Sequence, residues 1–146
     1  MTILLDSRTS QNASFASSLG EPFPAILTPQ LFGQVGLNIG KPTGSIRVEF
    51  FSTVTILLTP GTPPTGIFII IVRGATINDP IIYSALKTFE PFETTELVDP
   101  ITTIGSDFNV PAPANNELIY SAFVSTTTLG PVRIGPESFT VTAYSD

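Results

Sequence analysis

Four carboxylates recur at every third residue in one stretch of the chain, at Glu90, Glu93, Glu96 and Asp99. Carboxylates clustered on a loop could bind Ca²⁺, which prefers oxygen ligands. Calcium loops usually space their ligands more closely and turn sharply at a glycine, and residues 90–99 contain no glycine. We therefore interpret this stretch as a solvated acidic loop and predict no metal ligand in it.

The side chains that most enzymes use for proton transfer and nucleophilic attack are scarce. The sequence contains no His, no Cys and no Trp, so a serine nucleophile would lack a histidine base and no thiolate is present. A glycosidase would need two carboxyl groups facing each other across a cleft, and no pair of acids stands out for that role. The sequence predicts no catalytic residue, no cofactor and no enzymatic activity.

Three tyrosines offer a possible sugar-stacking platform, which would make the chain a carbohydrate-binding module. Tyr83 and Tyr120 lie within apolar runs, where a tyrosine more often packs in a core or at a sheet edge, and Tyr144 lies near the end of the sequence. Residues 12–14 match the N-glycosylation pattern, but the opening MTILLDSRTS has neither the basic region nor the apolar core of a signal peptide. We interpret the tyrosines as packing residues and the glycosylation pattern as incidental.

The surface implied by the composition is unusual. Charged residues make up 12% of the chain, against about 25% in typical proteins. The formal net charge is −6, which disfavours binding to nucleic acid or to anionic membranes. A weakly charged, apolar surface tends to associate, so we predict that the chain buries part of its exterior against copies of itself.

The hydrophobic pattern has a period of two along the chain. Residues 31–39 and 46–58 alternate apolar and other side chains, and the Pro- and Gly-rich residues 40–44 and 60–66 are turns. Residues 67–72 are apolar throughout, which predicts a central strand covered on both faces. Further short strands are predicted at residues 81–86, 107–110, 118–124 and 138–144. The predicted fold is all-β, an antiparallel β-sandwich of jelly-roll type with about eight strands.

The first thirty residues differ in composition from the rest. An apolar start at Thr2, Ile3, Leu4 and Leu5 is followed by Ser, Thr, Asn and Gln, and then by three prolines. We predict an extended N-terminal arm at residues 1–30 and a β-sandwich domain at residues 31–146. Thr2 to Leu5 are the candidate assembly residues, as a strand that pairs with another subunit.

Several strands carry a resemblance to a known family. The chain resembles small spore-surface proteins of endospore-forming bacteria, of the exosporium protein C type, which are similar in turn to the jelly rolls of the tumour-necrosis-factor and C1q kind. The matching segments are TILLDSRT (2–9), GQVGLNI (33–39), IFIIIVRG (67–74), DFNVPAP (107–113), ELIYSAFV (117–124) and GPESFTVTAYSD (135–146). The resemblance implies a structural protein assembled onto the spore within the mother cell, which needs no signal peptide.

Two features depart from relatives of this kind. The sequence has no collagen-like Gly-x-y stalk, and its first thirty residues lack the cysteines that cross-link endospore appendages, which it otherwise resembles in size and β content. We therefore expect a non-enzymatic structural protein that self-assembles into a spore-surface or extracellular layer or filament by strand pairing and packing. Its expected partners are copies of itself and other spore-surface proteins. The alternatives are a compact C1q-like homotrimer that acts as a binding module, and a viral surface jelly roll.

Overall fold

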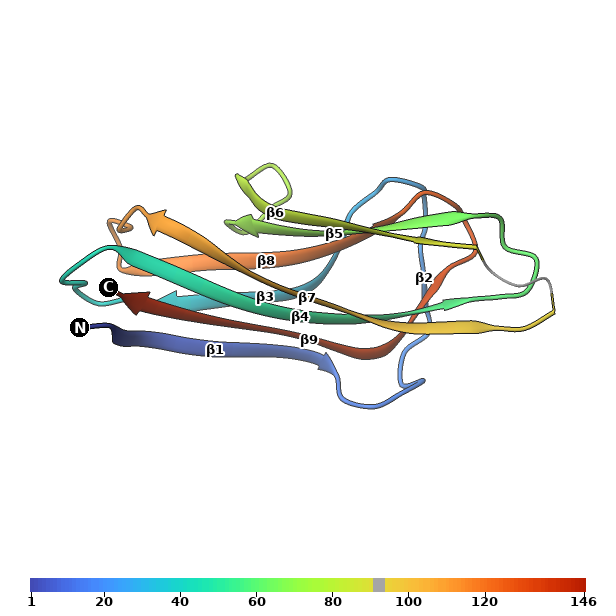
Figure 1. Cartoon of the computed structure of the whole chain (residues 1–146), viewed down its shortest axis with the longest axis horizontal. Coiled ribbons are helices and arrows are strands. Elements are labelled where there is room, and N and C mark those ends of the chain that lie inside the picture. The colour runs from blue at the N-terminus through green and yellow to red at the C-terminus, as the bar shows by residue number, and fades with distance from the viewer. Residues whose placement is uncertain (91–93) are drawn as a thin grey trace.

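Two antiparallel sheets pack face to face, and each combines strands from distant parts of the chain (Figure 1). The structure is a computed structural model that describes residues 1–90 and 94–146. Within them it contains nine strands and no helix that could cross a membrane. The strands are β1 (Ile3–Ala13), β2 (Glu21–Pro22), β3 (Gln30–Asn38), β4 (Ile46–Leu58), β5 (Thr65–Arg73), β6 (Ile81–Phe89), β7 (Leu97–Val110), β8 (Glu117–Thr126) and β9 (Val132–Ser145).

The strand order is that of a jelly roll. One sheet has the order β1-β9-β4-β7, with the short β2 also paired to β9, and the other has the order β3-β8-β5-β6. The eight long strands thus alternate between early and late parts of the sequence in both sheets. The predicted antiparallel jelly-roll sandwich is confirmed.

The core lies between the sheets and follows from the period of two. Alternate residues of β4 and β9 face inward, among them Phe50, Val54, Phe139 and Val141, all with no exposed surface. The opposite sheet contributes Leu37, Ile67, Ile69, Ile71 and Val124 to the same core. The predicted strands at residues 31–39 and 46–58 correspond to β3 and to a single long β4.

The strand β7 is longer than expected, because residues 97–106 extend it toward the acidic stretch. Pro100 and Gly105 lie inside this strand and hide it from pattern analysis. Proline is tolerated here because β7 is an edge strand and pairs only with β4 within its sheet. Part of the predicted acidic loop is therefore sheet.

The expectation of a doubly covered strand at residues 67–72 is half right. As predicted, β5 lies inside a sheet, between β8 and β6. Phe68 and Ile70, however, point away from the core and are only half-buried. Ile70 lies opposite Phe123 of β8, which is itself only 7% exposed, so the outer face is partly covered.

The segment expected as an N-terminal arm contains a strand of the sandwich. β1 pairs with β9 of the same chain from Ile3 opposite Ser145 to Ala13 opposite Glu137. A boundary at residue 30 therefore does not separate β1 from the sandwich in this structure. The pattern missed this because β1 is mostly exposed, so backbone pairing places it rather than apolar alternation. Pairing of the segment with another subunit stays a prediction.

One glycine sets how closely the two sheets approach. A Cβ atom at Gly33 of β3 would lie 2.4 Å from Cβ of the buried Phe139 on β9. Real side-chain carbons do not approach so closely, so β3 or β9 would have to move. Gly33 also lies at a register shift between β3 and β8, which indicates that the local backbone is already adapted to the contact.

We predict that Gly33→Ala lowers the free energy of unfolding by about 1–3 kcal/mol, because an added carbon in a packed core forces backbone shifts. Urea denaturation followed by circular dichroism measures this change. Gly20→Ala is the matched control, since a Cβ atom there has no neighbour within 4 Å, and it should change stability by less than about 0.5 kcal/mol. Equal stability of the two variants would contradict the close packing of β3 on β9.

Candidate assembly surface

The four candidate assembly residues lie at the start of β1, beside the C-terminal end of β9. Thr2 donates a hydrogen bond from Oγ1 to Oδ1 of Asp146, at 2.9 Å. Ile3 and Leu4 are 45% and 59% exposed, whereas Leu5 packs against the core. Two apolar side chains therefore remain on the surface at this end of the sandwich.

The outward surface of the β1-β9-β4-β7 sheet is largely uncharged at its centre. One row crosses all four strands through Thr9, Thr140, Phe51 and Ile104. The next row contains Gln11, Ser138, Thr53 and Thr102. We call these eight residues the uncharged outer face.

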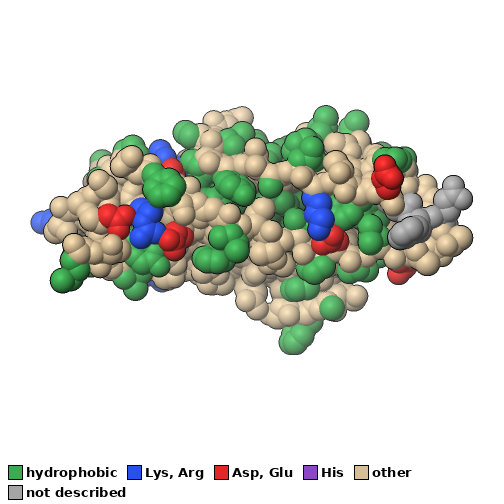
Figure 2. All heavy atoms as spheres, in the orientation of Figure 1, with side chains coloured by type: hydrophobic (Ala, Val, Ile, Leu, Met, Phe, Trp, Pro, Cys, Tyr) green, Lys and Arg blue, Asp and Glu red, His purple; other side chains and the backbone are tan. Residues whose placement is uncertain are grey.

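Hydroxyl pairs and one apolar pair hold the uncharged outer face together. The Oγ1 atoms of Thr9 and Thr140 lie 2.9 Å apart, and those of Thr53 and Thr102 lie 3.0 Å apart. Phe51 and Ile104 lie opposite each other and are 47% and 59% exposed. Figure 2 shows few charged side chains, several of them next to one of opposite charge, among hydrophobic and uncharged polar ones on one side of the molecule. Such a surface has little charge repulsion to oppose contact with another copy.

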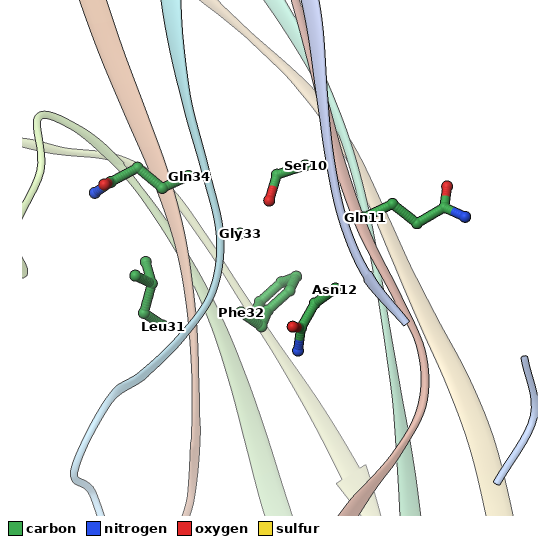
Figure 3. A pocket seen from close by; sticks show the side chains of 7 residues that line it. All are labelled: Ser10, Gln11, Asn12, Leu31, Phe32, Gly33 and Gln34. Atoms are coloured by element: carbon green, nitrogen blue, oxygen red, sulfur yellow. The ribbon is translucent and has the colours of Figure 1, made fainter. Parts of the chain in front are cut away.

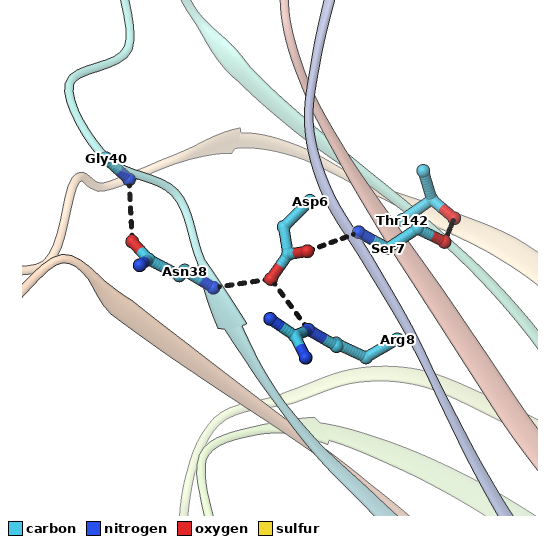
Figure 4. A network of polar contacts seen from close by, with 6 residues as sticks. All are labelled: Asp6, Ser7, Arg8, Asn38, Gly40 and Thr142. Atoms are coloured by element: carbon cyan, nitrogen blue, oxygen red, sulfur yellow. Dashed lines mark hydrogen bonds and ion pairs between the residues drawn. The ribbon is translucent and has the colours of Figure 1, made fainter.

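Asp6 ties the edge strands of the two sheets together (Figure 4). Its Oδ2 accepts hydrogen bonds from the backbone N–H of Asn38 on β3 at 2.8 Å and from Nε of Arg8 at 3.0 Å. Oδ1 accepts the backbone N–H of Ser7 at 2.9 Å. These donors, the Asn38 N–H above all, hold the pKa of the Asp6 carboxyl below its ordinary value, so the link is charged at neutral pH.

A buried ion pair anchors the other end of β1. Arg133 and Glu137, both on β9, are 6% and 0% exposed. The arginine donates from Nε to Oε2 at 2.7 Å and from Nη2 to Oε1 at 2.5 Å. Asn12 of β1 donates to Oε1 of Glu137 at 2.8 Å, and Arg133 donates to Oε1 of Gln30 at 3.3 Å. Both carboxylate oxygens are thus occupied, so Glu137 is placed to fix strands rather than to take a proton from a substrate.

A shallow groove of about 390 Å³ separates β1 from β3 (Figure 3). Ser10 and Asn12 point toward the groove, while Gln11 points away from it. β1 and β3 are edge strands of different sheets, so no backbone pairing joins them. Along this groove the two sheets are connected by side-chain contacts.

A second polar cluster joins the sheets through Asp107 of β7. Asp107 accepts two hydrogen bonds from Arg73, at 2.8 and 2.7 Å, and one from the Tyr120 hydroxyl at 2.8 Å. Burial and the neighbouring carboxylate raise the pKa of Tyr120 far above its usual value, so its hydroxyl remains a donor. The cluster therefore connects β7 of one sheet with β5 and β8 of the other.

The structure does not assemble the three tyrosines into one platform. Tyr120 is fully buried, and the ring of Tyr83 meets Phe50 edge-on with centroids 5.3 Å apart. Tyr144 lies beneath Arg47, whose guanidinium carbon is 4.6 Å from the ring centroid. Each tyrosine has its own packing role, as the sequence suggested for Tyr83 and Tyr120.

The acidic stretch is dispersed in the described residues. Asp99 lies on β7 and pairs with Lys87 of β6, with Nζ and Oδ2 2.6 Å apart. Glu90 and Glu96 are exposed, and Glu93 lies outside the described residues. Within the described part of the chain, no three acidic side chains gather as a metal site would require.

The sequence also contains one Ser-x-x-Lys arrangement, from Ser84 to Lys87. In some hydrolases this spacing activates the serine. Here both residues lie on the strand β6, where positions three apart point to opposite faces. The Lys87 ammonium instead pairs with Asp99, so the structure does not bring the two groups together.

The strand order and the two-sheet packing define the chain as a jelly-roll β-sandwich. No family model and no curated protein matches the sequence. The chain is similar to a structure of infectious bursal disease virus. The match covers 95% of this chain and 36% of the viral chain, with 11% sequence identity and a TM-score of 0.43. A match to dimeric latent PorU from Porphyromonas gingivalis covers 99% of this chain and 13% of the PorU chain, with 13% sequence identity and a TM-score of 0.44.

A match to cowpea mosaic virus top component covers 92% of this chain and 89% of the viral chain, with 11% sequence identity and a TM-score of 0.31. The chain thus spans about a third or less of the first two structures and most of the third. At these scores the similarity has no bearing on function, and the fold class rests on the strand order of the chain itself.

We predict that Glu137→Ala lowers the free energy of unfolding by about 3–5 kcal/mol, because Arg133 would be left buried without its partner. The double variant Arg133→Met with Glu137→Leu should recover most of this loss, since it removes both charges. Urea denaturation of the three proteins measures the difference. A single variant as stable as the double variant would contradict the role of the pair.

Proposed function

We propose that this chain is a non-enzymatic structural protein that self-assembles into a layer or filament on a spore surface or another extracellular surface. The observation that carries this proposal is the uncharged outer face, with its exposed Phe51 and Ile104. An exposed apolar pair at the centre of an uncharged surface favours contact with a matching surface.

The chemistry of the polar clusters supports a structural role. Glu137 and Asp107 are each saturated by an arginine and a further donor. Such carboxylates stabilise strand positions and are poorly placed to exchange protons with a substrate. The resemblance to spore-surface proteins adds the location, and the acidic, weakly charged composition suits contacts between like copies more than contacts with polyanions.

The proposal also accounts for the apolar side chains at the ends of the sandwich. Ile3, Leu4 and Phe15 are exposed near β1, and Ile81 and Leu86 are exposed on β6 at the edge of the other sheet. Edge strands with free backbone groups add strand pairing as a second mode of contact. Covalent cross-links through cysteine play no part, because the sequence has none.

The test is a dilution series by size-exclusion chromatography with negative-stain microscopy. The wild-type protein should form sheets or filaments above a threshold concentration. Replacing Phe51 and Ile104 together by Thr should raise that threshold at least about tenfold, since each buried apolar side chain contributes roughly 1.5–3 kcal/mol. Stability should change little, because both side chains are half-exposed in the single chain.

Leu129→Thr is the matched control, because Leu129 is 59% exposed but lies between β8 and β9, outside the uncharged outer face. It should assemble as the wild type does. A protein that stays monomeric at every concentration would contradict the proposal, and a uniform population of trimers would favour the compact binding module instead.

A further inference from the structure

β1 and β2 lie end to end along the same edge of β9, with slack chain between them. Ala13 of β1 lies opposite Glu137, and Glu21 of β2 lies opposite Arg133. Leu19 of the connection 14–20 also donates its backbone N–H to the carbonyl oxygen of Ile134, at 2.9 Å, so the unattached part is residues 14–18. From Glu137 to Ile134 β9 rises roughly 10 Å, whereas the chain from Ala13 to Leu19 could reach roughly 20 Å when extended. This connection swings outside the sheet at the end of β1 (Figure 1). The chain can therefore stay anchored at β2 while β1 moves away.

β1 contributes little to the apolar core of its own chain. Ala13 is its only buried residue, although Leu5 also packs on the core. Its attachments are the backbone pairing with β9 and a few polar links, through Ser7, Thr9 and Asn12 to β9 and through Asp6 to β3. All of these contacts could be made equally well by β1 of a second copy, because the strand and its site are identical in every chain.

The connection 14–20 has features that favour an extended form. Ser17 has a φ of 56°, in the left-handed region that costs residues other than glycine energy. Phe15 is 75% exposed, although its ring is fully apolar. Straightening the connection would relieve the backbone at Ser17, and contact with a neighbouring copy would cover Phe15.

We propose that β1 exchanges between copies during assembly, so that Ile3–Ala13 of one chain pairs with β9 of the next. β2 and Leu19 stay on β9 of their own chain, and residues 14–18 bridge the two molecules. Passed on from each copy to the next, this exchange links the subunits into an open chain, in addition to any contact through the uncharged outer face. The inference rests on the proposed self-assembly and names the segment that links the subunits.

The experiment uses two single-cysteine full-length chains, one of them isotope-labelled. Because the natural chain has no cysteine, Thr9→Cys and Thr140→Cys each introduce the only thiol. These positions lie directly opposite on β1 and β9, within disulfide reach. The two chains are unfolded together, refolded, assembled and oxidised mildly. Mass spectrometry then counts the mixed disulfide dimers in the assembled and monomeric fractions.

Thr53→Cys mixed with Thr102→Cys is the matched control. These two residues are also directly opposite, with wild-type hydroxyls 3.0 Å apart, but they lie on β4 and β7. Neither of these strands is proposed to leave its own chain. The exchange predicts at least tenfold more mixed dimer in the assembled fraction for the β1–β9 pair than for this control.

The outcomes separate the exchange from the proposed function. Sheets or filaments without an excess of mixed dimer would overturn the exchange and leave self-assembly standing. An excess of mixed dimer confined to discrete dimers would support exchange between two copies but overturn the open chain and the layer or filament. Protein that remains monomeric without mixed dimer would overturn both.

Discussion

The pairing of β9 on both of its edges is the constraint on which the rest of this structure depends. β9 lies between β4 on one side and β1 with β2 on the other. Its inward residues Phe139, Val141 and Ala143 are fully buried, so the strand cannot leave the core. Unpaired backbone groups beside a packed core are costly. The β1 edge of β9 therefore needs a partner strand, and that partner comes from its own chain in the monomer.

The polar groups inside the sandwich also hold β1 beside β9. Glu137 and Arg133 lie on β9 and reach β1 through Asn12 and the start of β3 through Gln30. Asp6 fastens the opposite end of β1 to β3, and Gly33 lets β3 approach Phe139 closely. The interior thus specifies where β1 belongs. The outer surface, with threonine pairs beside Phe51 and Ile104, leaves room for a second copy.

Sequence periodicity was sufficient where apolar burial determines the strand. β3 and β4 could be predicted almost to the residue, because their inward positions are apolar and their turns are rich in Pro and Gly. At both edges of one sheet, periodicity predicted only one end of each strand, residues 2–5 at the start of β1 and residues 107–110 at the end of β7. β1 is placed by backbone pairing and hydroxyl contacts, and most of β7 is hidden by Pro100 and Gly105. Those edges form part of the candidate assembly surface, so its residues could be only partly anticipated. The ion pair Arg133–Glu137 gave no signal, because two charges four residues apart are usually exposed.

Hydrogen exchange of the β9 amides, measured separately in monomer and assembled protein, tests the central claim most directly. If the β1 edge of β9 is always occupied, the amides bonded to β1 should be protected in both states. In the monomer they should exchange faster than the amides bonded to β4, because the proposed exchange requires β1 to leave without unfolding the core. Amides on the β1 edge that exchange as fast as those of an exposed loop in either state would contradict the account. The account would also be contradicted if the amides on both edges of β9 exchanged only through global unfolding, with the same free energy of opening.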